Sequence, residues 1–285
     1  MHSDSGCITS GVPQGSVLGL ILFLIYFKDI PTVIKAVSAL FADDTLVYRG
    51  DCKGERQTPC CGIQGDLHDL SRWAVDSSVQ FNITKSAELC VGSFPPVRSA
   101  ELDGSRLPRV NSQLHQGVLL DNKLCWKGHV DCLLKTVAGP VSLCKSLLYR
   151  HHLPPKAIRR FYLAFFRPRL EYCSAVWGGA ATRTLGKLEK LQLRVARALS
   201  SNRNLHGSEL LKTVNLPTLA WRRRFHRLTL MWQLYNGLGP PQLLSVFPEP
   251  LSVRSSLIHR VPHSLRFPSL STSRHLSSFF VLVCP

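Results

Sequence analysis

The pattern of apolar and polar positions changes character along the chain. The first part has short apolar runs bounded by turn residues. The longest of these runs covers residues 17–27 and follows a stretch rich in Gly and Pro, so we interpret it as a buried helix. Residues 37–42 and 45–49 are β-prone and flank Asp43 and Asp44, which predicts two strands joined by a tight hairpin.

The same mixture of elements continues to about residue 125. Residues 63–78 place apolar side chains on one helical face, and residues 87–93 and 117–121 are typical of strands. The pair Asp103-Gly104 is a strong signal for a hairpin turn. This part of the chain is therefore predicted to combine helices with short strands.

Beyond residue 126 the pattern is helical. The pair Pro154-Pro155 is predicted to open one helix, and Pro168 to kink or break it. A clear amphipathic stripe follows over residues 185–199, and another helix is expected at about 218–236. After Pro248 the chain is rich in Ser, Pro and Arg. We predict an α+β fold in three parts, with an α/β domain at 1–125, a basic helical domain at 126–247 and a disordered tail at 248–285.

Charge divides the chain at nearly the same place. Residues 1–120 contain 10 Lys and Arg against 12 Asp and Glu, whereas residues 121–285 contain 25 against 6. The first part therefore has a net charge of −2 and the second part +19, out of a total of +17, which indicates a polyanion such as nucleic acid as partner of the second part. One helical face in particular carries cations at three- and four-residue spacing: Lys187, Lys190, Arg194 and Arg197. The alternative is a solvated basic face without a specific ligand.

Two further features bear on the location of the protein. The apolar run at 17–27 has 11 residues, too few for a membrane span, and it lacks the basic start of a signal peptide. The ten cysteines are scattered and form no Cys-x-x-Cys pair, which favours reduced thiols. We therefore expect an intracellular protein, in the cytoplasm or nucleus, that is neither secreted nor bound to a membrane.

The adjacent carboxylates of Asp43 and Asp44 are the sharpest chemical signal. At the tip of a hairpin both side chains can reach one site, where they repel each other unless a cation or a proton lies between them. Mg²⁺ is commonly held by one or two carboxylates together with phosphate oxygens. Taken alone, the pair has an ordinary alternative explanation, because Asp is a favoured turn residue.

Four longer segments occur in a characteristic order: "SGVPQGSVLGLILFLIYFKDIP", "LFADDTLVYRG", "LSRWAVDSSVQFNITKS" and "QGVLLDNKLCWKGHV". In this combination the chain resembles the reverse transcriptases of non-LTR retrotransposons, the LINE-like elements of the jockey and chicken-repeat type. The resemblance covers about residues 10–239. It implies a partial reverse-transcriptase palm, an antiparallel sheet with helices, followed by a helical thumb and a C-terminal extension. The activity implied is RNA-directed DNA polymerisation by two-metal nucleotidyl transfer.

The resemblance also implies roles for individual residues. Asp43 and Asp44 match the metal-binding pair of the palm, with Mg²⁺ or Mn²⁺ as cofactor, and Lys85 is a candidate for protonating the leaving pyrophosphate. The loop that meets the template and the incoming nucleotide comprises Gly11, Pro13, Gln14, Gly15 and Ser16. Gly117 and Val118 match the strand that grips the primer. The implied partners are an RNA template, a DNA primer and deoxynucleoside triphosphates.

The match is incomplete at the front of the chain. The family carries a third catalytic carboxylate on a strand before "GVPQGS", and Asp4 is the only acidic residue there. The family's fingers are also missing, so we expect little or no polymerase activity from this chain alone. Three other hypotheses stay open: a non-catalytic nucleic-acid-binding protein that uses only the basic helices, a protein anchored to a membrane through residues 17–27, and a decayed genomic copy that yields no stable protein.

Overall fold

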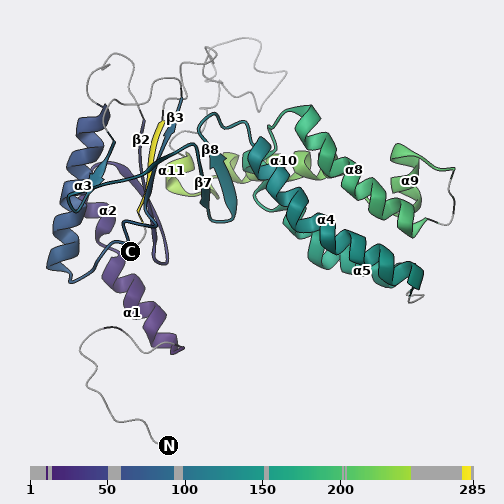
Figure 1. Ribbon diagram of the computed structural model, residues 1–285, viewed down its shortest axis with the longest axis horizontal. Helices are drawn as coiled ribbons and strands as arrows, with labels where there is room; N and C mark the ends of the chain where they lie inside the picture. Colours follow the sequence, from purple (N-terminus) through teal and green to yellow (C-terminus); the bar gives the residue numbers. More distant parts are fainter. Residues whose placement is uncertain are drawn as a thin grey trace, which may run out of the picture. The chain divides into compact units, whose positions relative to one another are not determined.

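The computed structural model forms two compact units (Figure 1). The residues that it describes are 11, 15–50, 59–92, 99–150, 154–200, 202, 204–244 and 278–283. The first unit consists of the described residues up to Gln113, the short segment Asp121–Lys123 and the C-terminal strand. The second unit consists of Leu114–Leu120 and the described residues from Leu124 to Leu244.

The first unit contains helices and short strands, as predicted. Its helices are α1 (Val17–Phe27), α2 (Ile30–Val33) and α3 (Pro59–Asp76). Its strands are β1 (Val37–Phe41), β2 (Asp44–Gly50), β3 (Ala87–Val91), β4 (Glu101–Leu102), β5 (Ser105–Arg106), β6 (Arg109–Val110) and β9 (Ser278–Val283).

Five of these strands form one sheet in the order β1-β2-β9-β3-β6. β9 lies between β2 and β3 and pairs antiparallel with both, so β2 and β3 run in the same direction without contacting each other (Figure 1). Residues 278–283 were expected to belong to a disordered tail. The structure instead places this apolar, β-prone segment, "SFFVLV", in the sheet. The rest of the expected tail, residues 248–277, lies outside the described part.

The short hairpins of this unit form where turn residues predict them. Asp103 and Gly104 both adopt positive φ between β4 and β5, as the Asp-Gly signal requires. At the first hairpin the two turn residues are Ala42 and Asp43, whereas Asp44 already pairs with Phe41. The predicted hairpin is therefore confirmed, with its turn one residue earlier than the Asp-Asp pair suggests.

The core of the first unit lies between α3 and the sheet. The predicted helical face of α3 is fully buried through Ile63, Leu67 and Leu70. The prediction for residues 17–27 is only half right, because they form helix α1 but most of its large side chains are exposed. The run is apolar around its whole circumference, and the described residues cover it only near Phe27. None of the helices in the described part of the chain has the length and apolar content needed to span a membrane.

The second unit is mainly helical. It begins with a hairpin of β7 (Ser112–His115) and β8 (Val118–Asp121), at which the chain passes from the first unit into the second. Its helices are α4 (Lys127–Arg150), α5 (Pro155–Phe161), the π-helix η1 (Tyr162–Phe166), α6 (Arg167–Glu171), α7 (Ser174–Trp177), α8 (Thr182–Leu199), α9 (Gly207–Thr213), α10 (Leu219–Tyr235) and α11 (Pro241–Leu244).

The proline predictions hold in this unit. Pro155 occupies the first turn of α5, where its missing N–H leaves no helical bond unmade. Pro168 lies in the first turn of α6, directly after the π-helical turn η1. A wider turn before Pro168 is a physical response to the absent N–H and to the bulk of the proline ring. The core of the unit is built around Trp177 and Tyr162, with the predicted stripe of α8 packed against them.

Candidate active site and nucleic-acid interface

The two predicted metal-binding aspartates occupy the tip of the β1–β2 hairpin. Asp43 is an exposed turn residue, and Asp44 is half-buried at the first position of β2. The turn is tight because Ala42 takes a left-handed conformation with φ of 50°. Backbone pairing between Phe41 and Asp44 closes the hairpin. The sequence therefore delivers two adjacent carboxylates to the rim of the sheet on a short, paired support.

Lys85 belongs to the same end of the sheet as the aspartates. Leu46 of β2 and Ala87 of β3 both pair with Leu282 of β9 and are therefore level with each other in the sheet. Asp44 lies two residues before Leu46, and Lys85 lies two residues before Ala87. The two strands are separated by one intervening strand, a spacing of roughly 10 Å between their backbones. Lys85 is exposed, and its backbone N–H is fixed by the Asn82 side chain at 3.2 Å. The structure thus puts the three predicted catalytic residues on one rim.

Part of the predicted template and nucleotide loop is described. Ser16 caps helix α1, because its hydroxyl accepts the N–H of Gly19 at 3.0 Å. Gly15 precedes it with φ of 83°, a left-handed conformation that favours glycine. Gly11 also has positive φ, at 94°. Pro13 and Gln14 lie outside the described residues.

The donor set at the hairpin suits a hard divalent cation. Asp43 and Asp44 supply carboxylate oxygens, the ligand type that Mg²⁺ and Mn²⁺ prefer. Across the described residues, no cluster of three or more His, Cys, Asp or Glu side chains is arranged to hold a metal. The residues present therefore fit one ion completed by water or phosphate oxygens, and they do not by themselves form a two-ion centre.

The predicted primer-gripping residues lie in the β7–β8 hairpin. Gln116 and Gly117 form its two-residue turn with φ of 46° and 75°, and Val118 is buried behind it. The hydroxyl of Tyr172 donates to the carbonyl of Gln116 at 3.0 Å, and the aromatic ring would lie 3.4 Å from a Cβ at position 117. The hairpin tip is thus held by a residue that no local pattern identifies, because Tyr172 is 56 positions away.

A second link between this hairpin and the helices runs through His129. Its ring is buried against Trp177, and its Nδ1 accepts the backbone N–H of Leu119 at 3.2 Å. The accepted bond requires Nδ1 to be unprotonated. Burial lowers the pKa of His129, which agrees with a neutral ring in the native state.

The predicted cationic face of α8 is present, with one change. Lys190, Arg194 and Arg197 are exposed, whereas Lys187 forms an ion pair with Asp131 of α4 at 2.6 Å. Arg183, which sequence reasoning overlooked, is also exposed and continues the same face seven residues before Lys190. Its distance of seven residues, or two helical turns, from Lys190 could have identified Arg183 from the sequence. We use the name α8 cationic face for Arg183, Lys190, Arg194 and Arg197.

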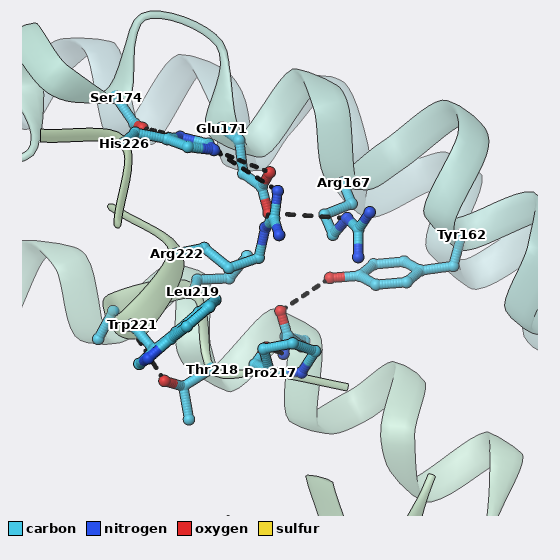
Figure 2. Close-up of polar contacts among 12 residues, drawn as sticks. Tyr162, Arg167, Glu171, Ser174, Pro217, Thr218, Leu219, Trp221, Arg222 and His226 are labelled. Carbon is cyan, nitrogen blue, oxygen red and sulfur yellow. Dashed lines mark hydrogen bonds and ion pairs between the residues drawn. The ribbon is translucent and has the colours of Figure 1, made fainter. Parts of the chain in front are cut away.

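A network of polar side chains inside the second unit fixes α10 to the rest of the unit (Figure 2). Glu171, which is almost fully buried, forms ion pairs with Arg222 and, at 3.7 Å, with Arg167. On the neighbouring side Glu189 accepts the N–H groups of Leu219 and Ala220 at the start of α10. These contacts satisfy the free N–H donors of a helix start and neutralise buried charges.

Ser174, His226 and Glu171 in this network are the three residue types of a hydrolase triad, but the two ring nitrogens of His226 have the opposite partners and the group is not accessible (Figure 2). The Ser174 hydroxyl lies 2.9 Å from His226 Nδ1, and His226 Nε2 lies 3.9 Å from Glu171. Ser174 is only 1% exposed, and the carboxylate of Glu171 is shared with two arginines. A nucleophile must be reached by its substrate, so this group serves as a structural anchor.

A buried chain of hydrogen bonds continues the network. Tyr162 donates to Gln192 at 3.0 Å, and Gln192 donates to the carbonyl of Pro217 at 2.7 Å. Burial raises the pKa of Tyr162, so its hydroxyl stays protonated as a donor. The segment that leads into α10 is therefore tied to both η1 and α8.

Comparisons with known proteins agree with this arrangement of motifs. The chain is 30% identical over 273 aligned residues to a probable RNA-directed DNA polymerase from the transposon X-element of Drosophila melanogaster, a match that covers 88% of the chain and 29% of that protein. It is 28% identical to the probable RNA-directed DNA polymerase from transposon BS of the same species, over 76% of the chain and 25% of the relative. It is 29% identical to the RNA-directed DNA polymerase from the mobile element jockey of Drosophila funebris, over 68% of the chain and 22% of the relative.

Two other comparisons found nothing. No protein-family model matches the chain. No solved structure matches it either. The chain spans between a fifth and a third of the length of the curated relatives that it matches. Over most of its own length, the chain is a homologue of the RNA-directed DNA polymerases of Drosophila transposons, as the order of its motifs predicts.

Proposed function

We propose that this chain is the part of a retrotransposon reverse transcriptase that carries the Asp-Asp hairpin and the helices that hold the primer and template. Residues 1–125 would be a partial palm, and residues 126–247 the thumb and its extension. The observation that carries the proposal is the placement of Asp43, Asp44 and Lys85 on one rim of the sheet. The function would be exercised inside the cell, where template RNA and deoxynucleotides are found.

In this proposal Asp43 and Asp44 hold a divalent cation, Mg²⁺ or Mn²⁺. When bound, such an ion neutralises charge on the phosphates of the incoming nucleotide. Lys85 is an exposed cation on the same rim and supplies a proton to the leaving pyrophosphate. A two-ion mechanism needs a further carboxylate, so the chain alone is expected to bind primer and template with little or no extension.

Nucleic acid would be held chiefly by the second unit. The α8 cationic face presents its charges at helical spacing, and each cation that neutralises a phosphate releases a counterion. The β7–β8 hairpin presents the backbone at Gly117 in a fixed turn that suits the end of a primer, and the buried Val118 anchors that turn in the core. Close approach of backbone to a nucleic-acid chain favours glycine at such a point.

The metal site can be tested without relying on polymerase activity. Mn²⁺ binding to the full chain is measured by electron paramagnetic resonance, and the double variant Asp43→Asn/Asp44→Asn is compared with Asp76→Asn, which removes an exposed acid from α3. We expect the double variant to lower Mn²⁺ affinity by at least about tenfold, because both ligands lose their charge. Equal binding by all three proteins would overturn the metal site.

Primer extension on an RNA template completes the test. We expect binding of the primed template with at most trace extension. Strong extension that Asp43→Ala abolishes would confirm the site and refute the expected inactivity. Failure to bind a primed template in low salt would refute the proposed function as a whole.

A second candidate function is non-catalytic binding of nucleic acid by the second unit alone. It is favoured by the exposure of Lys190, Arg194 and Arg197 on one helical face. The triple alanine variant should weaken duplex binding and reduce the salt slope by about 0.9 for each phosphate that is no longer neutralised. If the Asp43 and Asp44 variants also leave every nucleic-acid property unchanged, this second function is preferred.

A further inference from the structure

Helix α10 carries a row of large apolar side chains on its solvent side. The aromatic stripe, as we call it, comprises Trp221, Phe225, Leu228, Trp232 and Tyr235. Steps of four and three residues keep the stripe on one face of the helix, over a length of about 21 Å. Its members are 40% to 61% exposed, which is unusual for side chains of this size. So much exposed apolar surface on one helical face indicates a binding site.

The opposite face of α10 fixes the stripe in its outward orientation. Arg223 is buried and binds Glu189 at 3.2 Å, and Arg222 is bound to Glu171. His226 contacts Ser174 on the same inner side (Figure 2). Because these polar anchors hold the helix in one rotational setting, the aromatic stripe cannot turn inward to bury itself.

The charges beside the stripe select among possible partners. Arg224 and Arg227 are exposed on α10, and residues 219–235 include no acidic residue. The stripe has the 4-3 spacing of a coiled-coil seam, so a second copy could in principle pair with it. Such pairing would bring Arg224 of each copy toward a helix without any compensating acid, which disfavours the dimer. A polyanion is the complementary partner.

The shape of the stripe fits flat, stackable groups. The rings of Trp221 and Phe225 already lie nearly parallel, with centroids 5.5 Å apart and planes 13° apart. A hollow of about 350 Å³, lined by Lys212, Pro217 and Trp221 among others, opens at the beginning of the stripe. Four rigid rings beside arginines are the combination that binds single-stranded nucleic acid, with bases on the rings and phosphates on the cations.

From these observations we infer that α10 is a binding site for single-stranded nucleic acid, distinct from the α8 cationic face. Bases stack on the aromatic stripe, while Arg224 and Arg227 meet the phosphates. The inference takes its class of partner from the proposed function, but it needs neither the metal site nor polymerase chemistry. Within a reverse transcriptase, this site would hold the unpaired template or the unpaired end of the product.

The test compares two nucleic acids and two sets of variants in the full chain. Anisotropy is measured with a fluorescein-labelled oligouridylate and with a fully paired RNA–DNA duplex. The stripe variant is Phe225→Ala/Trp232→Ala, and the matched variant is Lys190→Ala/Arg194→Ala/Arg197→Ala on α8. We expect the stripe variant to weaken oligouridylate binding by a factor between about 5 and about 100. Duplex binding should change little. The α8 variant should chiefly weaken duplex binding.

A second stripe variant, Phe225→Leu/Trp232→Leu, preserves apolar surface but removes the flat rings. Loss of oligouridylate binding in this variant, with an unchanged thermal unfolding curve, supports stacking. Retained binding would overturn it. The inference also fails if the stripe variants turn a dimer into a monomer, or if they abolish binding to phosphatidylserine vesicles while oligouridylate binding is unaffected. Failure of the metal test leaves this result standing, so the two proposals are distinguishable.

Discussion

Lys187 Nζ lies 2.6 Å from Asp131 Oδ1, so one predicted nucleic-acid contact is already engaged within the protein. Both side chains remain about 40% exposed, and such a pair contributes about 0–1 kcal/mol to stability. Asp131→Asn should release Lys187 for a phosphate contact. We expect tighter duplex binding and a salt slope steeper by about 0.9, measured by anisotropy at several salt concentrations. Asp76→Asn, which removes an exposed acid from α3 of the first unit, is the control and should change neither quantity.

The pH dependence of stability should report on His129. Its native pKa is lowered by burial from an ordinary value of 6.5, so between these two values the unfolded chain binds a proton that the native chain does not. The contribution of neutral His129 to the free energy of unfolding should therefore be fully present above pH 6.5. It should be lost progressively as the pH falls below 6.5. Protonation at Nδ1 would also break the bond from the Leu119 N–H.

The variant His129→Asn keeps an acceptor near this position without a titrating ring. Denaturant unfolding of this variant should show a flatter pH profile between pH 7 and the acid range. The control is His68→Gln, a change at an exposed position of α3, and it should retain the wild-type profile. Identical profiles for wild type and His129→Asn would show that another group is responsible.

Gly117 should tolerate alanine poorly. Its φ of 75° is in the left-handed region, where a side chain costs about 1–2 kcal/mol. A Cβ there would meet the Tyr172 ring at an ordinary contact distance, so backbone strain is the dominant cost. Gly186→Ala, inside helix α8 with open space around it, should instead stabilise the protein by up to about 1 kcal/mol. Opposite signs in thermal unfolding would confirm this contrast, and a neutral Gly117→Ala would refute it.

Glu171→Gln should destabilise the second unit substantially. The carboxylate is 8% exposed and compensates Arg167 and Arg222, which would be left without their counter-charge. We expect a loss of about 2–3 kcal/mol in the free energy of unfolding, less than for a fully buried pair because Arg222 retains some exposure. Glu209→Gln, at an exposed position of α9, should cost far less. A similar small effect for both variants would show that the buried network does not hold α10.

Local patterns predicted the elements well and their surroundings less well. The Asp103-Gly104 turn and the stripe of α8 depend on neighbouring residues, so they could be read directly. Helix α1 was expected to be buried, but burial depends on what covers it, which periodicity does not reveal. The ion pair of Lys187 could not be predicted for the same reason, because its partner Asp131 lies 56 positions away in the sequence.

The candidate site likewise has one part that the sequence predicts and another part that depends on contacts distant in the sequence. The Asp43-Asp44 hairpin was predictable because turn chemistry and strand propensity act over a few residues. The shared rim with Lys85 was not, because it depends on two strands that meet only through β9. The aromatic stripe of α10 was equally hidden, since its spacing resembles that of a core face until Arg222 and Arg223 are found on the inner side.

The position of β9 has a consequence for the order of folding. Thr45 and Val283 pair in the sheet although they are 238 positions apart in the chain. Pairings of such long sequence separation form late, because a long loop must close before any bond rewards it. During synthesis the helices of the second unit can therefore pack first, and the sheet that supports the aspartates can be completed only when residues 278–283 have left the ribosome.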